Sequence, residues 1–520
     1  MPLSGSERPI ATSVSAEQPP NRTEQAFAGW LWLSAGAVVQ GLVTVASLAV
    51  LARLLSPADF GAVSAGMLVV NLVSIVSQGL VGPALVQHPR LRPEHIHTGF
   101  ALSLWGGAVL FGVLWVVAPT VGLVLHSAGL VAVLRALAWM LPLQGLGAVA
   151  DALLRRDLEY GPIARIRMVS YAIGYGAIGV TVAVLGGGLW ALVAANLSQV
   201  SLNTILLLSR KRHSKLIRIS RRELGELVSF AGGFCLGKVG NYAATEGDYL
   251  VTVKWLGLAA LGLYERAYQL MAMPAILVGQ VLDDVLFPAM AQIQTERNSI
   301  AKAYRRCVAA VALFALPLSA LVLILAPEIV NVLLGPKWGQ VVPPFRVLAL
   351  GTVFRTSYKI SDSLTRALGA VYQRAWRQWT YAGLVVGGGI IGQQWGLQGV
   401  AAAVLLALMV NFLLTAHLAT RLISLSWADY FRAHVAGARA AAFVGFPGLI
   451  IATVTRTVLG LPPAAVLLAT LVGTGLVVAA LLTANPPWLL GADGQYLVRE
   501  GAAFVRRRVR RAGPPVRRTI

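Results

Sequence analysis

The sequence predicts an all-α polytopic membrane protein. Hydrophobic residues make up 57% of the 520 residues, and charged residues only 12%. Apolar stretches recur along nearly the whole length, a pattern that soluble domains do not show. Together these observations exclude a soluble globular fold and favour a bundle of membrane-spanning helices.

About fourteen apolar stretches are long enough to cross a hydrocarbon core about 30 Å thick. An even number of crossings would place both termini on the same side of the membrane. The predicted spans are residues 29–53, 60–86, 99–122, 129–153, 166–186, 189–209, 229–252, 258–288, 305–327, 345–365, 378–395, 398–420, 438–457 and 463–483.

The basic residues predict the orientation of these spans. Most of the 43 lysines and arginines lie in every second exposed segment, counted from the N-terminal tail. Cytoplasmic loops carry such an excess, so both termini are expected in the cytoplasm. The basic residues expected at the outward face are Arg53, Arg135, Lys254, Lys337, Arg346 and Arg456.

The composition also argues against several classes of function. The net charge of +22 indicates no nucleic-acid partner, because the basic residues alternate with apolar runs and form no patch on a soluble face. Cys235 and Cys307 both lie in or beside apolar segments, so neither a disulfide framework nor a Cys-x-x-Cys metal site is expected. The string G-x-x-x-x-G-K-[ST] is absent, which argues against an ATP-driven pump. No cofactor and no metal are predicted.

A weak internal repeat predicts two lobes. Residues 54–66 (LLSPADFGAVSAG) and 255–267 (WLGLAALGLYERA) each indicate a helix end, a tight turn and a new helix. Paired helical repeats are common in secondary transporters, whose substrates bind between the repeats. The predicted units are a cytoplasmic N-terminal tail (1–28) unlike a signal peptide, an N-lobe of helices 1–6 (29–223), a C-lobe of helices 7–12 (224–421), two appended helices (422–483) and a basic cytoplasmic C-terminal tail (484–520).

A charged stripe interrupts the tenth predicted span. Arg355, Lys359 and Asp362 are spaced by four and then three residues, so they share one helix face. A charge at the bilayer centre costs roughly 2.5 to 3.5 kcal/mol, so this face should line a water-filled cavity or contact a partner helix. The alternative is that Lys359 and Asp362 pair locally and that Arg355 reaches the membrane interface.

The seventh span carries a second polar face, which holds Lys238, Asn241 and Tyr242. Cations inside a cavity would attract an anion, and Arg and Lys side chains match phosphate oxygens well. We therefore predict an anion site formed by Lys238, Arg355 and Lys359, with Asn241 and Tyr242 beside it. The alternative is that the glycines of this span serve only helix packing.

Three carboxylates are candidates for binding a driving proton or cation, because a partly desolvated carboxylate takes up a proton more readily. Glu246 and Asp248 flank the polar face of the seventh span, and Glu265 opens the eighth. The simpler alternatives are that Glu246 offsets the charge of Lys238 and that Glu265 pairs with Arg266.

No catalytic residues are predicted. A membrane glycosyltransferase or acyltransferase generally needs a large extramembrane domain or loop, whereas no outward loop here exceeds roughly 20 residues. His88, His95, His97 and His126 form no convincing acid-base group, and the first three are expected in solvated loops. Residues 496–511 form a basic amphipathic stretch, which is expected to lie on the anionic inner leaflet.

The most specific features are three stretches at residues 51–61 (LARLLSPADFG), 255–274 (WLGLAALGLYERAYQLMAMP) and 326–350 (APEIVNVLLGPKWGQVVPPFRVLAL). Together they resemble the Wzx-type oligosaccharide flippases, the polysaccharide-transporter branch of the multidrug/oligosaccharidyl-lipid/polysaccharide (MOP) exporter superfamily. The similarity runs over about residues 29–420, and the block GPKW is its most specific part. That family has no universal binding motif, so the resemblance assigns no site residue.

The resemblance implies a flippase of the bacterial cytoplasmic (inner) membrane that moves undecaprenyl-pyrophosphate-linked oligosaccharide repeat units by alternating access of two lobes. The pyrophosphate of this substrate would suit the predicted cationic side chains. Such a protein would serve exopolysaccharide or lipopolysaccharide assembly, with a polysaccharide polymerase and export machinery as partners. The alternatives are a lipid-linked peptidoglycan precursor flippase, a cation-coupled small-molecule exporter of the same superfamily, a membrane transferase or a structural membrane protein. The sequence leaves open the glycan, the coupling ion and the oligomeric state.

Overall fold

The computed structural model describes residues 41, 43–88, 90–214, 216–273, 290, 293, 296–484 and 495. In these ranges the chain is helical and contains no strand, which confirms the all-α class. Residues 43–54 and 258–273 are helical. The other elements are α2 (Pro57–Gln87), α3 (Pro93–Val124), α4 (Gly129–Ala138), α5 (Met140–Arg156), α6 (Tyr160–Tyr171), the π-helix η1 (Ala172–Gly179), α7 (Val180–Val184), α8 (Leu189–Arg210), α9 (Arg221–Leu256), α11 (Arg297–Leu333), the 3-10 helix η2 (Pro336–Val341), α12 (Val342–Ala367), α13 (Val371–Gly392), the 3-10 helix η3 (Gln393–Trp395), α14 (Gly396–Leu422), α15 (Trp427–Thr457) and α16 (Pro463–Ala484).

Every predicted span coincides with helical residues, although the first and the eighth are described only in part. Among the described residues, nine helical segments are long and apolar enough to cross a membrane, and one of them, Tyr372–Leu422, contains both α13 and α14. α9 and α12, which carry the predicted intramembrane charges, are not among the nine. The number of crossings therefore stays a prediction. Both terminal tails, including the basic stretch 496–511, lie outside the described residues.

Local sequence signals explain several helix ends. Ser56 caps α2: its Oγ accepts the backbone N–H of Asp59 at 3.2 Å, and the Asp59 carboxylate accepts the backbone N–H of Ser56 at 2.9 Å. This reciprocal pair is a capping box, and Pro57 in the first turn supplies a dihedral angle suited to a helix. Gly257 and Gly335 have φ values of +87° and +100°, which favour glycine at the turns that follow α9 and α11.

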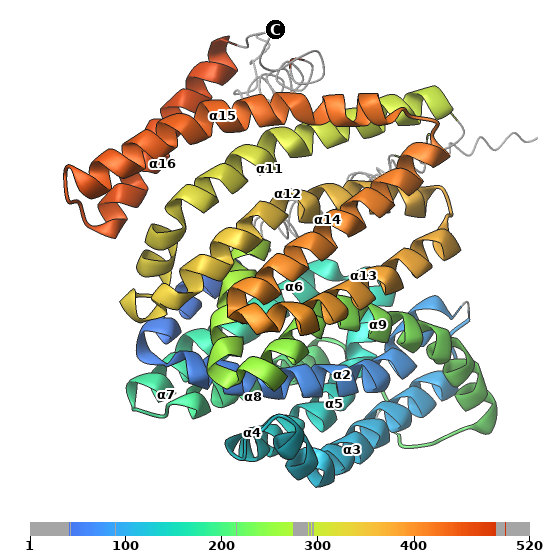
Figure 1. The fold of residues 1–520 in the computed structure, drawn as a ribbon. Coiled ribbons are helices and arrows are strands. Elements are labelled where there is room, and N and C mark those ends of the chain that lie inside the picture. The colour runs from blue at the N-terminus through green and yellow to red at the C-terminus, as the bar shows by residue number, and fades with distance from the viewer. Residues whose placement is uncertain are drawn as a thin grey trace, which may run out of the picture.

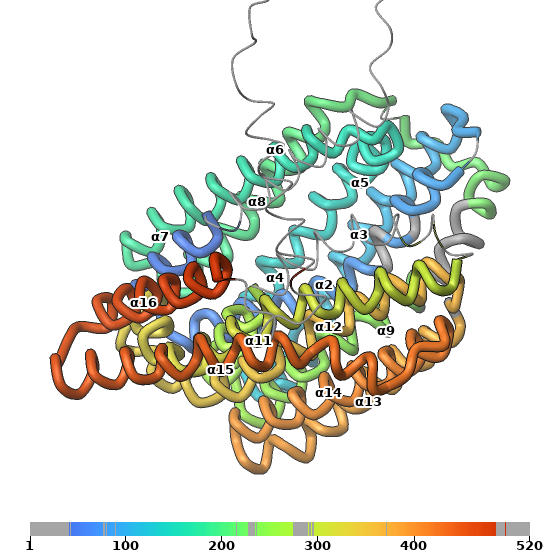
Figure 2. The backbone as a smooth tube through the Cα atoms, turned by 90° about the horizontal axis from the view of Figure 1, so that it is seen from above, coloured from blue at the N-terminus to red at the C-terminus, as the bar shows by residue number. Residues whose placement is uncertain are grey.

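The helices form two groups, which the two views show on opposite sides (Figures 1 and 2). One group contains α3, α5, α6 and α8, and the other contains α11 to α15. α2 and α9 lie near the junction and pack against each other, and α9 also packs against α13. The largest hydrophobic core draws side chains from both groups. The predicted lobe boundary at residue 223 stays a prediction.

The three stretches that carry the family resemblance meet at one end of the junction, which we call the Trp338 end. The indole Nε1 of Trp338 donates a hydrogen bond to the carbonyl oxygen of Ala52 at 2.8 Å, and Trp338 itself is fully buried. Lys337 Nζ donates to the carbonyl oxygen of Arg53, also at 2.8 Å. The ring of Phe60 contacts the Trp338 ring edge-on, with centroids 5.4 Å apart. The Trp338 end is therefore closed.

Two glycines allow an unusually close approach of helices at this end. A Cβ atom on Gly61 would lie 1.7 Å from the carbonyl oxygen of Leu258, and one on Gly262 would lie 1.9 Å from that of Pro57. No side chain fits at such distances, so α2 and the helix over residues 258–273 touch backbone to backbone. This contact adds to the closure made by Trp338.

α15 is tied to α11 by an ion pair. Arg456 donates to both carboxylate oxygens of Glu328, at 2.7 and 2.6 Å, and to the carbonyl oxygen of Ile324 at 2.6 Å. The Glu328 side chain is 7% exposed and that of Arg456 is 28% exposed. A bidentate pair of this kind is among the stronger polar contacts. It fixes the appended helices to the second group.

Candidate functional site

A polar cavity of about 850 Å³, which we call cavity 1, lies at the junction of the two groups. Its volume falls in the upper part of the range for ligand pockets. The helices at the junction all contribute to its wall, so a ligand here would contact both groups. The polar side chains that line it are Thr44, Ser64, Asn71, Tyr171, Tyr175, Asn196 and Gln199 from the chain up to α8, and Glu246, Tyr249, Glu265, Arg266, Tyr268, Gln269 and Arg355 from α9, the helix over residues 258–273 and α12.

A second cavity of about 690 Å³, cavity 2, shares Gln199 with cavity 1 and therefore adjoins it. Its charged lining consists of Arg155, Arg167, Lys238 and Asp151. Asp151 holds both arginines, because its carboxylate lies 2.6 Å from Arg155 and 3.7 Å from Arg167. Three basic groups and one acidic group leave an excess of positive charge, which would attract an anion.

The structure separates the predicted cations. Arg355 lines cavity 1, Lys238 lines cavity 2, and the half-buried Lys359 lines neither. The guanidinium of Arg355 hydrogen-bonds the hydroxyl of Tyr268, and its Nε has no hydrogen-bond partner among the described residues. Lys238, Arg355 and Lys359 therefore do not form one compact site.

The last residue of the stripe, Asp362, contacts other partners than the predicted local one. Its carboxylate accepts a hydrogen bond from Arg374 on α13 and lies 3.4 Å from Arg366. This half-buried carboxylate, held between two arginines, serves the packing of α12 against α13. The charged stripe thus combines one cavity residue, Arg355, with a structural ion-pair network.

Tyr242 and Asn241 also lie outside the linings of the two cavities. The Tyr242 hydroxyl donates to the carbonyl oxygen of Leu68 on α2 at 2.8 Å. Asn241 is exposed, and its Oδ1 lies 3.4 Å from Nε2 of Gln378 on α13. In this conformation both side chains link helices.

Two of the three candidate coupling carboxylates, Glu246 and Glu265, line cavity 1. Glu265 pairs with Arg266 at 2.8 Å and also accepts a hydrogen bond from Ser64. Asp248 is instead buried beside the cavity, where it accepts a hydrogen bond from the Tyr264 hydroxyl at 2.8 Å. The predicted pair of Glu265 with Arg266 is confirmed.

Sequence reasoning missed Arg155 and Arg167 as candidate site residues. Both belong to the basic segment 155–167, which joins the fourth and fifth predicted spans and overlaps the start of the fifth, and there their charges indicate membrane orientation. In the structure α5 extends to Arg156 and α6 begins at Tyr160, so both arginines lie on helices. The one available signal is the spacing of four residues between Asp151 and Arg155, which predicts a helical ion pair.

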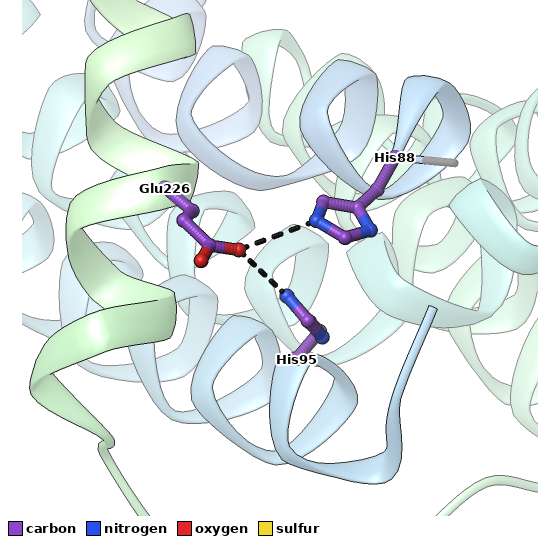
Figure 3. A group of neighbouring side chains, drawn as sticks. All are labelled: His88, His95 and Glu226. Carbon is purple, nitrogen blue, oxygen red and sulfur yellow. Dashed lines mark hydrogen bonds and ion pairs between the residues drawn. The ribbon is translucent and has the colours of Figure 1, made fainter. Parts of the chain in front are cut away.

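A separate polar cluster joins α2, α3 and α9 at the far end of α2 from Trp338 (Figure 3). The Nε2 atoms of His88 and His95 lie 3.3 and 3.1 Å from the same carboxylate oxygen of Glu226. The expectation that His95 lies in a solvated loop is wrong. α3 begins at Pro93, so His95 lies in the first turn of a helix and not in a loop. Its side chain is fully buried. We call these three residues the His95 clasp.

The ligand atoms of the His95 clasp lie within 4.8 Å of one another, so the three residues could hold a metal ion. The hydrogen bonding favours a different arrangement. Nδ1 of His95 accepts the backbone N–H of Arg92 at 3.2 Å, so Nε2 carries the proton of the neutral ring and donates it to Glu226. A metal-ligating histidine usually donates a hydrogen bond from its other nitrogen, and here that nitrogen is an acceptor.

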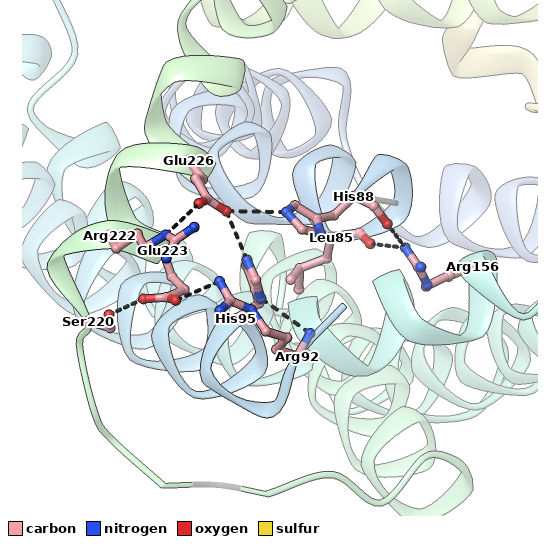
Figure 4. Close-up of polar contacts among 9 residues, drawn as sticks. All are labelled: Leu85, His88, Arg92, His95, Arg156, Ser220, Arg222, Glu223 and Glu226. Atoms are coloured by element: carbon pink, nitrogen blue, oxygen red, sulfur yellow. Dashed lines mark hydrogen bonds and ion pairs between the residues drawn. The ribbon is translucent and has the colours of Figure 1, made fainter. Parts of the chain in front are cut away.

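Further contacts surround the clasp (Figure 4). Arg92 pairs with Glu223 at 2.9 Å, and Arg156 donates to the carbonyl oxygens of Leu85 and His88 at 3.0 and 2.6 Å. These bonds fasten the start of α9, before the predicted seventh span, to α2, α3 and α5. The hydrogen bonds from the two histidines, that of His95 foremost, lower the pKa of the Glu226 carboxyl to about 2.

Comparison with solved structures identifies the fold. The fold matches a structure described as the lipid II flippase MurJ in an inward closed conformation, with a TM-score of 0.71 and 12% identity, over 87% of this chain and 99% of that chain. It also matches an inward-facing multidrug resistance MATE family transporter of the MOP superfamily, with a TM-score of 0.58 and 17% identity, over 74% of this chain and 96% of that one. The protein therefore has the fold of a MOP-type membrane transporter.

Residues 50–343 match the family described as polysaccharide biosynthesis protein, and the chain belongs to that family. Its relatives include the succinoglycan biosynthesis transport protein ExoT of Rhizobium meliloti (strain 1021), which is 28% identical over 62% of this chain and 65% of ExoT. The teichuronic acid biosynthesis protein TuaB of Bacillus subtilis (strain 168) is 24% identical over 67% of this chain and 73% of TuaB. The lipopolysaccharide biosynthesis protein WzxC of Escherichia coli (strain K12) is 21% identical over 75% of this chain and 80% of WzxC.

Proposed function

We propose that the protein is a flippase that moves undecaprenyl-pyrophosphate-linked oligosaccharide repeat units across the bacterial cytoplasmic membrane, for exopolysaccharide or lipopolysaccharide assembly. The observation that carries this proposal is the pair of adjoining polar cavities at the junction of two helix groups, in a chain of the polysaccharide biosynthesis family. The names of the relatives, which include succinoglycan transport and lipopolysaccharide biosynthesis, support the substrate class.

The pyrophosphate binds in cavity 2 under this proposal. Arg155, Arg167 and Lys238 provide the positive excess there, and guanidinium groups can bind phosphate oxygens in bidentate fashion. Asp151 keeps both arginines in place. The polyprenyl tail remains in the lipid, because its transfer into a polar cavity would cost hydrophobic free energy. Arg355, Lys359, Asn241 and Tyr242 are proposed contacts of the head group in other conformations.

The transport step is a change of access rather than a covalent reaction. The closed Trp338 end, which the sequence places outward, leaves entry to the opposite, cytoplasmic side. The Trp338 end then opens while the cytoplasmic end closes, and the head group leaves on the outer side. Glu246, Asp248 and Glu265 are the proposed sites for a coupling proton or cation. Both termini are proposed to lie in the cytoplasm, where the basic tail contacts anionic lipid.

A flip assay in proteoliposomes tests the function and the site together. The substrate is a fluorescent undecaprenyl-pyrophosphate-linked oligosaccharide, and the variants are Lys238→Ala, Arg167→Ala and Arg355→Ala. The first two should lower the flipping rate at least about tenfold, as expected for the loss of one charge-assisted phosphate contact. Matched controls are Lys302→Ala and Arg212→Ala, since both side chains are exposed and line neither cavity.

The outcomes separate the two claims. If the wild type moves no lipid-linked glycan, the flippase proposal is wrong. If the wild type is active and Lys238→Ala and Arg167→Ala are as active as their controls, cavity 2 is not the pyrophosphate site, although the function stands. A strong loss in Arg355→Ala alone would place the pyrophosphate in cavity 1.

A further inference from the structure

The π-helical segment η1 forms part of the wall of cavity 1. It interrupts a helical segment that runs from Tyr160 to Val184. π-Helical turns are rare and occur frequently at functional sites. Gly174 brings this segment close to α8, because a Cβ atom there would lie 2.8 Å from the carbonyl oxygen of Ala195. The wider turn and the close contact with α8 together determine which side chains reach the cavity.

Tyr171, the last residue of α6, and Tyr175 in η1 are half-buried and line cavity 1. Their rings are stacked, with centroids 4.7 Å apart and planes inclined by 10°. The stack holds each ring against the other, and Thr44 and Asn196 line the cavity beside them. A fixed aromatic surface loses little conformational entropy when a ligand packs on it.

The rest of the lining suits neutral, hydroxylated groups better than phosphate. Glu246 and Glu265 are formally matched by Arg266 and Arg355, so the formal charges of the four ionisable side chains that line cavity 1 sum to zero. A phosphate here would face two carboxylates, whereas cavity 2 has a positive excess. Sugar hydroxyls both donate and accept hydrogen bonds, and carboxylates, guanidinium groups and the amide of Gln199 can satisfy both functions.

We propose that Tyr171 and Tyr175 form a glycan-binding wall, on which sugar rings of the transported oligosaccharide pack with their apolar C–H faces while the pyrophosphate occupies cavity 2. This inference rests on the proposed function. The aromatic faces carry negative partial charge, which attracts the C–H edges of a sugar ring. Gln199 lines both cavities, so the head group can extend from one to the other. Ring stacking makes recognition depend on the presence of pyranose rings more than on one pattern of hydroxyls.

Binding of three defined lipids to the purified full-length protein tests the proposal. The lipids are undecaprenyl pyrophosphate, undecaprenyl pyrophosphate carrying one glucose, and undecaprenyl pyrophosphate carrying a tetrasaccharide of glucose and galactose. Replacing both tyrosines by leucine should weaken binding of the tetrasaccharide lipid about tenfold, and should change binding of undecaprenyl pyrophosphate by less than about twofold. The double phenylalanine variant retains both rings and should keep most of the affinity. Tyr372→Leu, at a position 91% exposed, is the matched control.

Two results would overturn the proposal while leaving the proposed function intact. One is equal affinity of the wild type for the tetrasaccharide lipid and for undecaprenyl pyrophosphate. The other is unchanged affinity of the double leucine variant for the tetrasaccharide lipid. If undecaprenyl pyrophosphate itself does not bind, or binds independently of Lys238, the proposed pyrophosphate site in cavity 2 is wrong. The glycan-binding wall, which depends on that site, is then wrong as well. Thermal unfolding checks that each variant is folded, and Tyr175→Leu alone replaces the double variant if that protein is unstable.

Discussion

At the scale of single residues, the Glu226 carboxyl offers a test of the His95 clasp. Hydrogen bonds from the histidines lower its pKa from an ordinary value of 4.5 to about 2. A carboxyl with a depressed folded-state pKa stabilises the fold above its unfolded pKa, and this contribution is lost as the pH falls through the folded value. We therefore expect Glu226→Gln to lower the thermal unfolding midpoint at pH 7, and its difference from the wild type to shrink between pH 4.5 and pH 2.

Thermal unfolding in detergent over a series of pH values measures this effect. Glu94→Gln is the matched control, because Glu94 is an exposed carboxylate in the first turn of the same helix as His95. It should show no comparable dependence on pH. A difference between Glu226→Gln and the wild type that stays constant down to pH 2.5 would show that the clasp does not hold the carboxylate in its charged form.

Some of the residues that the sequence singled out line the two cavities, for a physical reason. Intramembrane charge is costly, so the sequence identified Arg355, Lys238 and Glu246 as unusual, and the structure places each of them in a cavity wall. The sequence could not tell that Lys238 and Arg355 line different cavities, because that depends on how α9 and α12 pack. It also gave no reason to separate Arg155 from ordinary cytoplasmic loop charges.

At the scale of elements, the backbone contact between α2 and the helix over residues 258–273 depends on Gly61. A Cβ atom at this position would lie 1.7 Å from the carbonyl oxygen of Leu258, so the two helices must move apart in Gly61→Ala. Overpacking of this kind typically costs about 1–3 kcal/mol. Gly82→Ala in the same helix is the control, because nothing lies within 4 Å of its added methyl group. It should be neutral or slightly stabilising.

Thermal unfolding of both alanine variants decides this point. Equal midpoints for Gly61→Ala and Gly82→Ala would mean that the helices do not approach as closely as the structure has them.

The elements themselves were largely predictable, since apolar length fixes a membrane helix and the Ser56–Asp59 pair is a recognisable cap. The π-helix η1 was not predictable, because hydropathy is the same for an α-helical and a π-helical register.

At the scale of the whole molecule, the proposed transport needs two access states. The Trp338 end is closed by contacts that join residues on opposite sides of the junction. Alternating access requires that these contacts break while the opposite end closes. A variant that weakens them should shift the population toward the state that is open at the Trp338 end.

Trp338→Phe tests this shift, because it keeps an aromatic ring in the buried site and removes the hydrogen bond to Ala52. Loss of one buried hydrogen bond costs about 1–3 kcal/mol, enough to change a two-state population about fivefold to a hundredfold. The reporter is Asn71→Cys, whose side chain lines cavity 1, in a protein with Cys235 and Cys307 replaced by serine. We expect faster labelling of this cysteine by a membrane-impermeant maleimide added from outside the cell.

Two controls make the labelling result interpretable. Trp395→Phe alters a tryptophan that is 68% exposed and should leave the labelling rate unchanged. Lys337→Cys reports orientation, since the positive-inside rule puts this residue outside, and labelling from the cytoplasmic side alone would reverse the topology. If Lys337→Cys is labelled from outside and Trp338→Phe labels no faster than the wild type, Trp338 does not hold the outward end closed. The closure would then depend on the other contacts at this end, which include the hydrogen bond from Lys337 to Arg53 and the glycine contact between α2 and the helix over residues 258–273. Gly61→Ala, which disrupts the glycine contact, should then speed the labelling in the same assay.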